Sequence, residues 1–248
     1  MTEQDPYRRP HALELTPGRP EPAYPSPRPS DPGDATVVLR GVTVRYGAVT
    51  AIEGVDLAAH TGTVVALTGP SGAGKSTLLW AIAGAVALDA GEVTIDGAHI
   101  TNRTAGIRAD VVLIPQGNGL AGVLTAAENI AFPLLATGVP ARDVPGIVER
   151  SLADVGLGES GNHLVEELSG GQQQRVAVAR GLAASPTVLL ADEPTSELDH
   201  VTREQVLDLL RAQADRGAVV IMATHDPEAA ALADREVRLD EGRLSLVR

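Results

Sequence analysis

The sequence of 248 residues contains no cysteine and few aromatic side chains: one Phe, one Trp and three Tyr. The absence of cysteine excludes disulfide bonds and cysteine-ligated metal sites, and it fits a reducing compartment. No apolar run approaches the roughly 20 residues that a membrane-spanning helix needs. The first 35 residues lack the apolar segment of a signal peptide. We therefore expect a protein that does not itself cross a membrane.

An excess of basic residues is also absent. The formal net charge is −12 and the sequence pI is about 4.9. A nucleic-acid-binding domain usually presents a basic face, so this charge argues against nucleic acid as a partner. Hydrophobic residues make up 44% of the chain, which is enough for a packed core. The length allows one large domain or two small ones.

Lysine is almost absent, because the 20 Lys and Arg residues comprise one lysine and 19 arginines. The single lysine, Lys75, lies in Gly69-Pro-Ser-Gly-Ala-Gly-Lys-Ser-Thr77, which matches the pattern G-x-x-x-x-G-K-[ST] of a phosphate-binding loop (P-loop). Lysine is a compact charge on a flexible stem, and it reaches phosphates where a planar guanidinium would be crowded. The alternative is one lysine left by chance in a glycine-rich turn, but the flanking segments favour the P-loop.

The segments on either side of this loop predict the rest of a phosphate site. Residues 63–68 form an apolar run typical of a buried strand, and a helix is expected to begin near Lys75. Backbone N–H groups of the loop and the helix dipole favour a bound anion there. The Ser76 hydroxyl is a candidate Mg²⁺ ligand. The predicted nucleotide-binding residues of the loop are Gly69, Pro70, Ser71, Gly72, Ala73, Gly74, Lys75, Ser76 and Thr77.

Proline divides the chain into a tail and a folded part. Residues 1–35 hold nine of the 17 prolines and few apolar residues, which is typical of a disordered tail. From residue 36 onward, apolar runs alternate with helical patterns and predict an α/β core. Strands are expected over 37–45 with a turn near Gly41, 49–57, 92–97, 111–115, 188–191 and 219–223. Helices are expected over 169–184, 200–215 and after Asp226, and residues 119–167 are predicted mostly helical with breaks at Pro133, Pro140 and Pro145.

Polar residues follow three of the predicted strands. Asp192 and Glu193 follow the apolar run 188–191. Beside a P-loop, the first carboxylate can hold Mg²⁺ and the second can polarise a water for attack on a phosphate. His225 and Gln116 end two other strands, where they can contact a phosphate, the metal or the attacking water. The alternatives are an ordinary acidic strand end and a structural histidine, as we interpret His11, His60, His99, His163 and His200.

A second candidate anion site lies in Leu168-Ser-Gly-Gly-Gln-Gln-Gln-Arg175. Ser169 at a predicted helix start, followed by Gly170 and Gly171, exposes a hydroxyl and backbone N–H groups. A capped loop–helix junction explains the serine and one glycine, but it does not explain the whole string.

Leu168-Ser-Gly-Gly-Gln172 resembles the signature motif of ATP-binding cassette (ABC) ATPases, and it lies shortly before the Asp192-Glu193 strand, as in that family. The resemblance covers about residues 36–248. It implies an α/β, P-loop NTPase ABC-type core with an N-terminal antiparallel β-subdomain and an inserted helical subdomain over about 119–184. The implied domains are a tail over 1–35 and an ATP-binding domain over 36–248.

The resemblance also implies a role for each motif residue. Residues 69–77 are similar to Walker A, and 196–199 are similar to the D-loop. ATP and Mg²⁺ are the implied cofactors. The implied roles are adenine stacking for Tyr46, Mg²⁺ binding for Ser76, Gln116 and Asp192, catalysis for Glu193, His225 and Gln116, and nucleotide binding by the signature residues Ser169, Gly170, Gly171 and Gln172.

In this family two cassettes pair head to tail, and each ATP lies between one P-loop and the other cassette's signature motif. One copy of each motif per chain therefore implies a dimer of chains. All catalytic positions are filled, so the resemblance implies an active ATPase rather than a degenerate site. Residues 124–135 and 224–235 are similar to cassettes of the macrolide-efflux and lipoprotein-release type. Their permeases are separate proteins that work by mechanotransmission. This resemblance implies a peripheral subunit on the cytoplasmic face of the cell membrane, held there by a permease.

Two other functions stay open. A soluble ABC ATPase that acts on macromolecules is the first, although such proteins usually carry tandem cassettes or a long coiled coil, and this sequence shows neither pattern. The second is a signalling complex that controls a cell-wall enzyme through a permease-like partner. The sequence does not separate it from a transporter, and it does not name a transported substrate.

Overall fold

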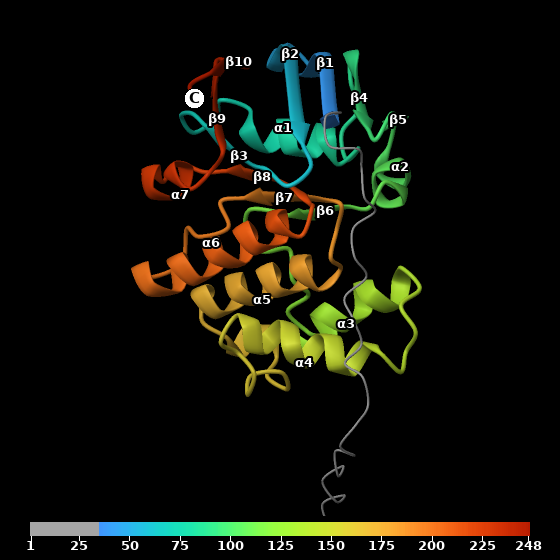
Figure 1. The fold of residues 1–248 in the computed structure, drawn as a ribbon, viewed down its shortest axis with the longest axis vertical. Helices are drawn as coiled ribbons and strands as arrows, with labels where there is room; N and C mark the ends of the chain where they lie inside the picture. Colours follow the sequence, from blue (N-terminus) through green and yellow to red (C-terminus); the bar gives the residue numbers. More distant parts are fainter. Residues whose placement is uncertain (1–34) are drawn as a thin grey trace, which may run out of the picture.

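The computed structural model describes residues 35–248, and the predicted tail therefore lies outside the described residues except for Ala35, which begins the first strand. The described chain forms two sheets and a set of helices on either side of the larger one (Figure 1). The smaller sheet has the strand order β2-β1-β4-β5, and the larger has the order β10-β9-β3-β8-β7-β6.

The strands are β1 (Ala35–Tyr46), β2 (Val49–His60), β3 (Val64–Thr68), β4 (Ala90–Ile95), β5 (Ala98–His99), β6 (Val111–Ile114), β7 (Val188–Asp192), β8 (Val219–Ala223), β9 (Arg235–Asp240) and β10 (Arg243–Leu246). The helices are α1 (Lys75–Ile82), α2 (Arg103–Arg108), α3 (Ala126–Ala136), α4 (Val144–Asp154), the 3-10 helix η1 (Val165–Glu167), α5 (Gly170–Ala183), α6 (His200–Asp215) and α7 (Pro227–Ala231). The predicted strands over 63–68, 188–191 and 219–223 and the helices over 169–184 and 200–215 are confirmed.

The large sheet supplies the framework of the site. Strands β3, β8, β7 and β6 are parallel, and every residue of β7 and β8 is buried. Burial on both faces explains why these strands are continuous apolar runs rather than alternating ones. Because parallel strands end at the same sheet edge, the loops after β3, β7, β8 and β6 lie together.

Helix α1 lies between the two sheets (Figure 1). Its Leu78, Leu79 and Ile82 are fully buried in one cluster with residues of both sheets, such as Ile52 of β2 and Leu190 of β7. On the opposite face of the large sheet, α5 and α6 pack in a second cluster with α3 and α4. The helix that follows the P-loop is therefore anchored in the core between the two sheets.

In the small antiparallel sheet, the predicted turn near Gly41 is wrong, because β1 continues through this position as a single strand. The register against β2 shifts between Leu39 and Val42, and Gly41 adopts φ +57. Its N–H donates to the Asp56 carboxylate at 2.8 Å, so the backbone forms a bulge with its own hydrogen-bond partner rather than a turn.

The predicted helix break at Pro133, in the segment between β6 and β7, is wrong. Pro133 lies inside α3, and the helix continues past it. A proline in a helix removes one backbone hydrogen bond. Ala126, Ile130 and Leu134 of α3 follow one face at a spacing of four residues and are buried, which offsets that loss. Pro145 lies in the first turn of α4, where a missing N–H has no consequence.

No helix within residues 35–248 is both long and apolar enough to span a membrane.

Candidate nucleotide site

The predicted strand–loop–helix unit is confirmed: β3 ends at Thr68 and α1 begins at Lys75. Two positions in the loop between them require glycine, because the backbone of a neighbouring strand lies too close for a side chain, and the strand differs between the two positions. Gly69 has φ +137, and a Cβ there would clash with the backbone oxygen of Leu239 in β9. Gly74 has φ +102, and a Cβ there would clash with the backbone oxygen of Ala51 in β2. Strands of both sheets thus press on the loop and fix its shape.

Lys75 points back along the loop. Its Nζ donates to the carbonyl oxygens of Gly69 at 2.8 Å and Pro70 at 3.1 Å. The side chain is largely buried, so the charge is held at the centre of the loop by backbone dipoles. An incoming phosphate offers a stronger, charge-assisted acceptor for the same ammonium group. The loop therefore holds its one cation at the place where a phosphate would lie.

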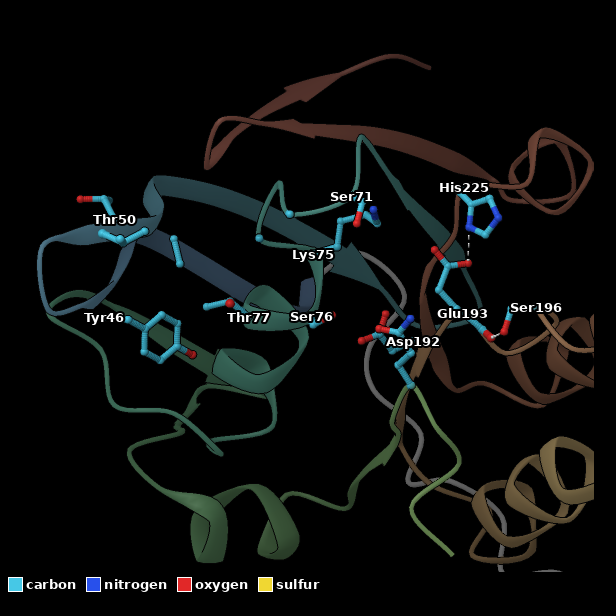
Figure 2. A pocket seen from close by; sticks show the side chains of 15 residues that line it. Tyr46, Thr50, Ser71, Lys75, Ser76, Thr77, Asp192, Glu193, Ser196 and His225 are labelled. Carbon is cyan, nitrogen blue, oxygen red and sulfur yellow. Dashed lines mark hydrogen bonds and ion pairs between the residues drawn. The ribbon is translucent and has the colours of Figure 1, made fainter. Parts of the chain in front are cut away.

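A pocket of about 620 Å³ brings most of the predicted residues together (Figure 2). It is lined by residues of the P-loop, the strand ends and the turn after β1. Of the predicted residues, Tyr46, Ser71, Gly72, Gly74, Lys75, Ser76, Thr77, Gln116, Asp192, Glu193 and His225 line it. Gly69 and Pro70 line the neighbouring cavity instead, and Ala73 is buried behind the loop. The pocket is also lined by Ser196, the first residue of the predicted D-loop, and by Val49, Thr50 and Ala51, which were not predicted as site residues.

The two ends of the pocket differ in chemistry (Figure 2). Tyr46 and Thr50 lie at one end, and Glu193, His225 and Ser196 lie at the other, with Lys75 between them. Tyr46 is about half exposed and lines the pocket, so its ring is accessible for stacking on a flat base. An elongated ligand with a base at one end and phosphates at the other matches this division.

Asp192 ends β7 in an unusual environment for a carboxylate. Only 4% of the residue is exposed. Burial raises the pKa of Asp192 above its ordinary value, and the neighbouring Glu193 charge adds to the increase, while the hydrogen bond from Ser76 and the charge of Lys75 oppose it. A divalent cation bound here would stabilise the ionised carboxylate. Asp192, the Ser76 hydroxyl and the Gln116 amide line the same pocket and offer the oxygen ligands that Mg²⁺ prefers.

No cluster of three or more His, Cys, Asp or Glu that could hold a metal ion occurs among the described residues.

Glu193 and His225 contact each other across two strand ends. The His225 Nδ1 lies 2.9 Å from the Glu193 Oε2 (Figure 2). Glu193 has φ +53, a left-handed conformation that is unfavourable for a residue with a long side chain. Its N–H donates to the Ala223 carbonyl at 3.0 Å, which ties β7 to the end of β8. The carboxylate is thus aimed at the pocket by a strained backbone, and a histidine orients it.

The signature residues lie outside this pocket. Ser169 caps α5: its Oγ accepts from the Gln172 N–H at 3.3 Å, while Gln172 Oε1 accepts from the Ser169 N–H at 2.9 Å. Neither these residues nor Gly170 and Gly171 line the nucleotide pocket. Within one chain, the predicted second anion site and the P-loop therefore do not meet.

The sequence interpretation missed Gln174. Its amide bonds to the segment after β7, which includes Glu193 and Ser196. Helical spacing does not single it out, because Gln173 precedes the buried Val176 and Ala177 by three and four residues just as Gln174 precedes Ala177 and Val178. Only the polar partners that a buried amide needs distinguish Gln174 in the structure.

The parallel sheet, the glycine loop before α1 and the carboxylates after β7 define a P-loop nucleotide-binding protein. Comparison with known proteins identifies its family. The family model for "ABC transporter" matches residues 52–196, and the chain belongs to this family as an ATP-binding cassette subunit.

Named relatives agree with this assignment. The lipoprotein-releasing system ATP-binding protein LolD of Roseobacter denitrificans is 45% identical over 219 residues, which are 84% of this chain and 96% of the relative. The spermidine/putrescine import ATP-binding protein PotA of Pseudomonas aeruginosa is 40% identical over 83% of this chain and 57% of the relative. The dimeric post-hydrolysis state of the cassette MJ0796, bound to ADP and Pi, has a TM-score of 0.79 at 33% identity. The match covers 86% of this chain and 99% of that one.

Proposed function

We propose that this protein hydrolyses ATP and couples dimer closure to a conformational change in a separate membrane permease. The observation that carries the proposal is the pocket in which Lys75, Asp192 and the Glu193–His225 pair converge. Positioning and charge stabilisation dominate phosphoryl transfer, and this pocket supplies both.

Each residue has a defined task in this proposal. Tyr46 stacks on the base, while Lys75 and the backbone N–H groups of residues 69–77 hold the phosphates. Ser76, Asp192 and Gln116 would hold Mg²⁺, which neutralises charge that develops on the phosphate oxygens. Glu193 accepts a proton from the attacking water, and His225, 2.9 Å away, orients the carboxylate and contacts the γ-phosphate.

The proposed active unit is a head-to-tail dimer. Ser169, Gly170, Gly171 and Gln172 are presented at the start of α5 but do not line their own chain's pocket. A second copy would bring this helix N-terminus to the γ-phosphate, where backbone N–H groups and the helix dipole stabilise negative charge. The similar cassette MJ0796 is dimeric and bound to ADP and Pi, which supports a dimer of chains.

The proposed partner is a permease of the export or mechanotransmission type. The similarity to LolD over almost the whole length of that relative supports this subtype, whereas PotA, named for import, is matched over about half its length. We propose a peripheral location on the cytoplasmic face of the cell membrane, reached through the permease. The folded cassette domain is proposed to span residues 36–248, with a helical subdomain over about 119–184.

The first experiment tests the chemistry. Glu193→Gln keeps the shape of the side chain but removes the base, so kcat should fall by about 100-fold or more, while the Kd for ATP stays within about twofold. Glu92→Gln, at a half-buried carboxylate on β4 that pairs with Arg40 and does not line the pocket, is the matched control and should retain full activity. Lys75→Ala should instead weaken ATP binding by roughly 10- to 100-fold. Full ATPase activity in Glu193→Gln would contradict the assignment of the base.

The second experiment tests the partner. Tagged Glu193→Gln protein is captured with ATP from detergent-solubilised membranes, since blocked hydrolysis preserves the closed state. A permease with few membrane spans and a large outer domain would support mechanotransmission. A permease with many spans would move the protein to another transporter class, and only soluble partners or ribosomes would favour the alternative of a soluble ABC ATPase.

A further inference from the structure

Gln174 lies in the second turn of α5, with 4% of the residue exposed. Its amide makes three hydrogen bonds to one short segment, residues 193–197. Nε2 donates to the Glu193 carbonyl at 2.7 Å and to the Ser196 Oγ at 3.3 Å, and Oε1 accepts from the Glu197 N–H at 2.7 Å. The amide nitrogen and the amide oxygen of this one buried side chain thus both hold the loop over residues 193–197.

The loop that Gln174 holds begins with the proposed base. Glu193 adopts φ +53, a conformation that persists only where its surroundings enforce it. Its carbonyl accepts from Gln174, from the Ser196 Oγ at 3.1 Å and from the Ser196 N–H at 3.3 Å. These three donors, together with the bond from the Glu193 N–H to Ala223, fix the peptide units on both sides of the residue. Gln174 makes the shortest of the bonds to this carbonyl and is the donor from outside the loop, so it links the orientation of Glu193 to α5.

The signature segment at the start of α5 also packs directly against the loop over residues 193–197. A Cβ on Gly171 would lie 2.9 Å from the Glu197 carbonyl oxygen, and a Cβ on Gly170 would lie 3.3 Å from the Glu197 Oε2. The start of α5 and the loop over 193–197 consequently pack backbone against backbone. Together with the bonds of Gln174, this contact makes the signature segment and the base parts of one rigid unit.

We infer that Gln174 is a positioning residue that links the two nucleotide sites of the dimer. The inference rests on the proposed head-to-tail arrangement, in which a chain's signature segment contacts one ATP and its Glu193 acts on the other. When an ATP engages the signature segment, the displacement of α5 passes through Gln174 to the backbone of Glu193. Hydrolysis at one site thereby becomes dependent on occupancy of the other.

The test uses a linked dimer in which one half carries Glu193→Gln, so that only the half with intact Glu193 hydrolyses ATP. Gln174→Met, which has a similar length but forms none of the three bonds, is placed in either half. In the half with intact Glu193, kcat should fall by about 10-fold or more, the KM for ATP should stay within about twofold, and the Hill coefficient should approach one. In the half that carries Glu193→Gln, Gln174 holds a residue that can no longer act as the base. Gln174→Met in that half should therefore lower kcat by about twofold at most.

Two further variants separate positioning from a general loss of packing. Gln174→Glu keeps an acceptor for the Glu197 N–H but cannot donate to the Glu193 carbonyl, so it should resemble Gln174→Met. Gln213 is equally buried, at 1% exposed, and donates to the Pro186 carbonyl away from the pocket. Gln213→Met should lower the melting temperature without changing the Hill coefficient.

Equal losses of kcat from Gln174→Met in the two halves, or a large rise in KM, would show that the substitution merely distorts α5 and would overturn the inference. A failure of the unmodified linked dimer to hydrolyse ATP would instead overturn the proposed function, and this inference with it. Thermal unfolding of each linked dimer confirms that the halves are folded.

Discussion

The Asp192 carboxyl ends a fully buried strand, and at neutral pH it must be ionised to bind a cation. Burial raises its pKa above the ordinary value of 3.8, with a contribution from the Glu193 charge. The folded state therefore binds this proton more tightly than the unfolded state does. Between the ordinary pKa and the raised one, stability falls as the pH rises, and above that window the full destabilisation is present.

This sign leads to a prediction for Asp192→Asn, which keeps the shape and removes the charge. Without nucleotide, the variant should melt a few degrees higher than the native protein at pH 7, since about 1 kcal/mol corresponds to roughly 2–4 °C in a domain of this size. The difference should shrink as the pH falls through the raised pKa and should vanish below the ordinary pKa of 3.8, where Asp192 is protonated in both states. Magnesium-dependent ATP hydrolysis should be lost. Thermal unfolding across this pH range and an ATPase assay check both parts.

Asp234 provides a control of opposite sign. Burial alone would raise its pKa, but the Val64 N–H and the Arg211 guanidinium outweigh burial and lower the pKa below its ordinary value. Its ionised form therefore stabilises the fold above the ordinary pKa, and this stabilisation is lost as the pH falls through the lowered one. Asp234→Asn should lower the melting temperature at pH 7. A decrease in melting temperature for both variants would contradict the interpretation of Asp192.

At the scale of residues, the sequence predicted the functional residues at strand ends, but it did not predict the residue that holds their loop in position. Asp192, Glu193 and His225 follow apolar runs, so the strand pattern alone places them at one sheet edge. Gln174 is different, because its partners lie 19 to 23 residues away along the chain. Three consecutive glutamines look alike in sequence, and only the packing of α5 against the loop after β7 distinguishes the third.

At the scale of elements, helix α5 joins the signature segment to the sheet through a glycine. A Cβ on Gly181 would lie 2.8 Å from both Cγ1 and Cδ1 of Ile114 in β6 and 3.5 Å from Cδ1 of Leu189 in β7. Gly181 and Ile114 are both buried. The glycine thus sets how closely the helix approaches the two strands that lead to Gln116 and Asp192.

Gly181→Ala should therefore destabilise the protein despite the better helix propensity of alanine. Overpacking costs about 1–3 kcal/mol, and the gain in propensity returns up to about 1 kcal/mol. A net loss of about 1 kcal/mol would lower the melting temperature by roughly 2–4 °C. In an Ile114→Ala background, which removes both Cγ1 and Cδ1, the same substitution should become neutral or stabilising. Denaturant unfolding of the four proteins in this cycle measures the coupling.

Gly122→Ala serves as the comparison, because a Cβ at this position meets no atom within 4 Å. It should leave stability nearly unchanged. An equal loss from Gly181→Ala in both Ile114 backgrounds would show that Ile114 is not the obstructing residue.

The elements that sequence patterns predicted least well are short or amphipathic. Strands β9 and β10 were not anticipated, since their buried residues alternate with exposed charged ones such as Arg238 and Asp240. We predicted a turn at Gly41 and a helix break at Pro133, because these are the usual local effects of glycine and proline. Tertiary contacts decided otherwise in both cases: Asp56 accepts the free N–H in the bulge, and the buried face of α3 maintains the helix.

At the scale of the whole molecule, the two halves of a composite nucleotide site are separated within one chain. The P-loop opens into the pocket beside α1, whereas Ser169 starts α5 on the other face of the large sheet and does not line that pocket. A dimer that pairs these halves has a measurable consequence, because damage to the two halves can then be complemented between chains but not within one.

Lys75→Ala damages only the P-loop half, and Ser169→Arg damages only the signature half. Each variant alone should have little ATPase activity. An equimolar mixture should recover at most about a quarter of the unmodified activity, since half of the dimers are mixed and each mixed dimer has one intact site of two. A chain that carries both substitutions, mixed with the unmodified chain, forms mixed dimers with no intact site and should reduce activity instead. If the first mixture recovers nothing and the second keeps about half of the unmodified activity rather than about a quarter, while all variants are folded and dimerise with the unmodified chain, each chain must complete its own site, and the head-to-tail arrangement is wrong.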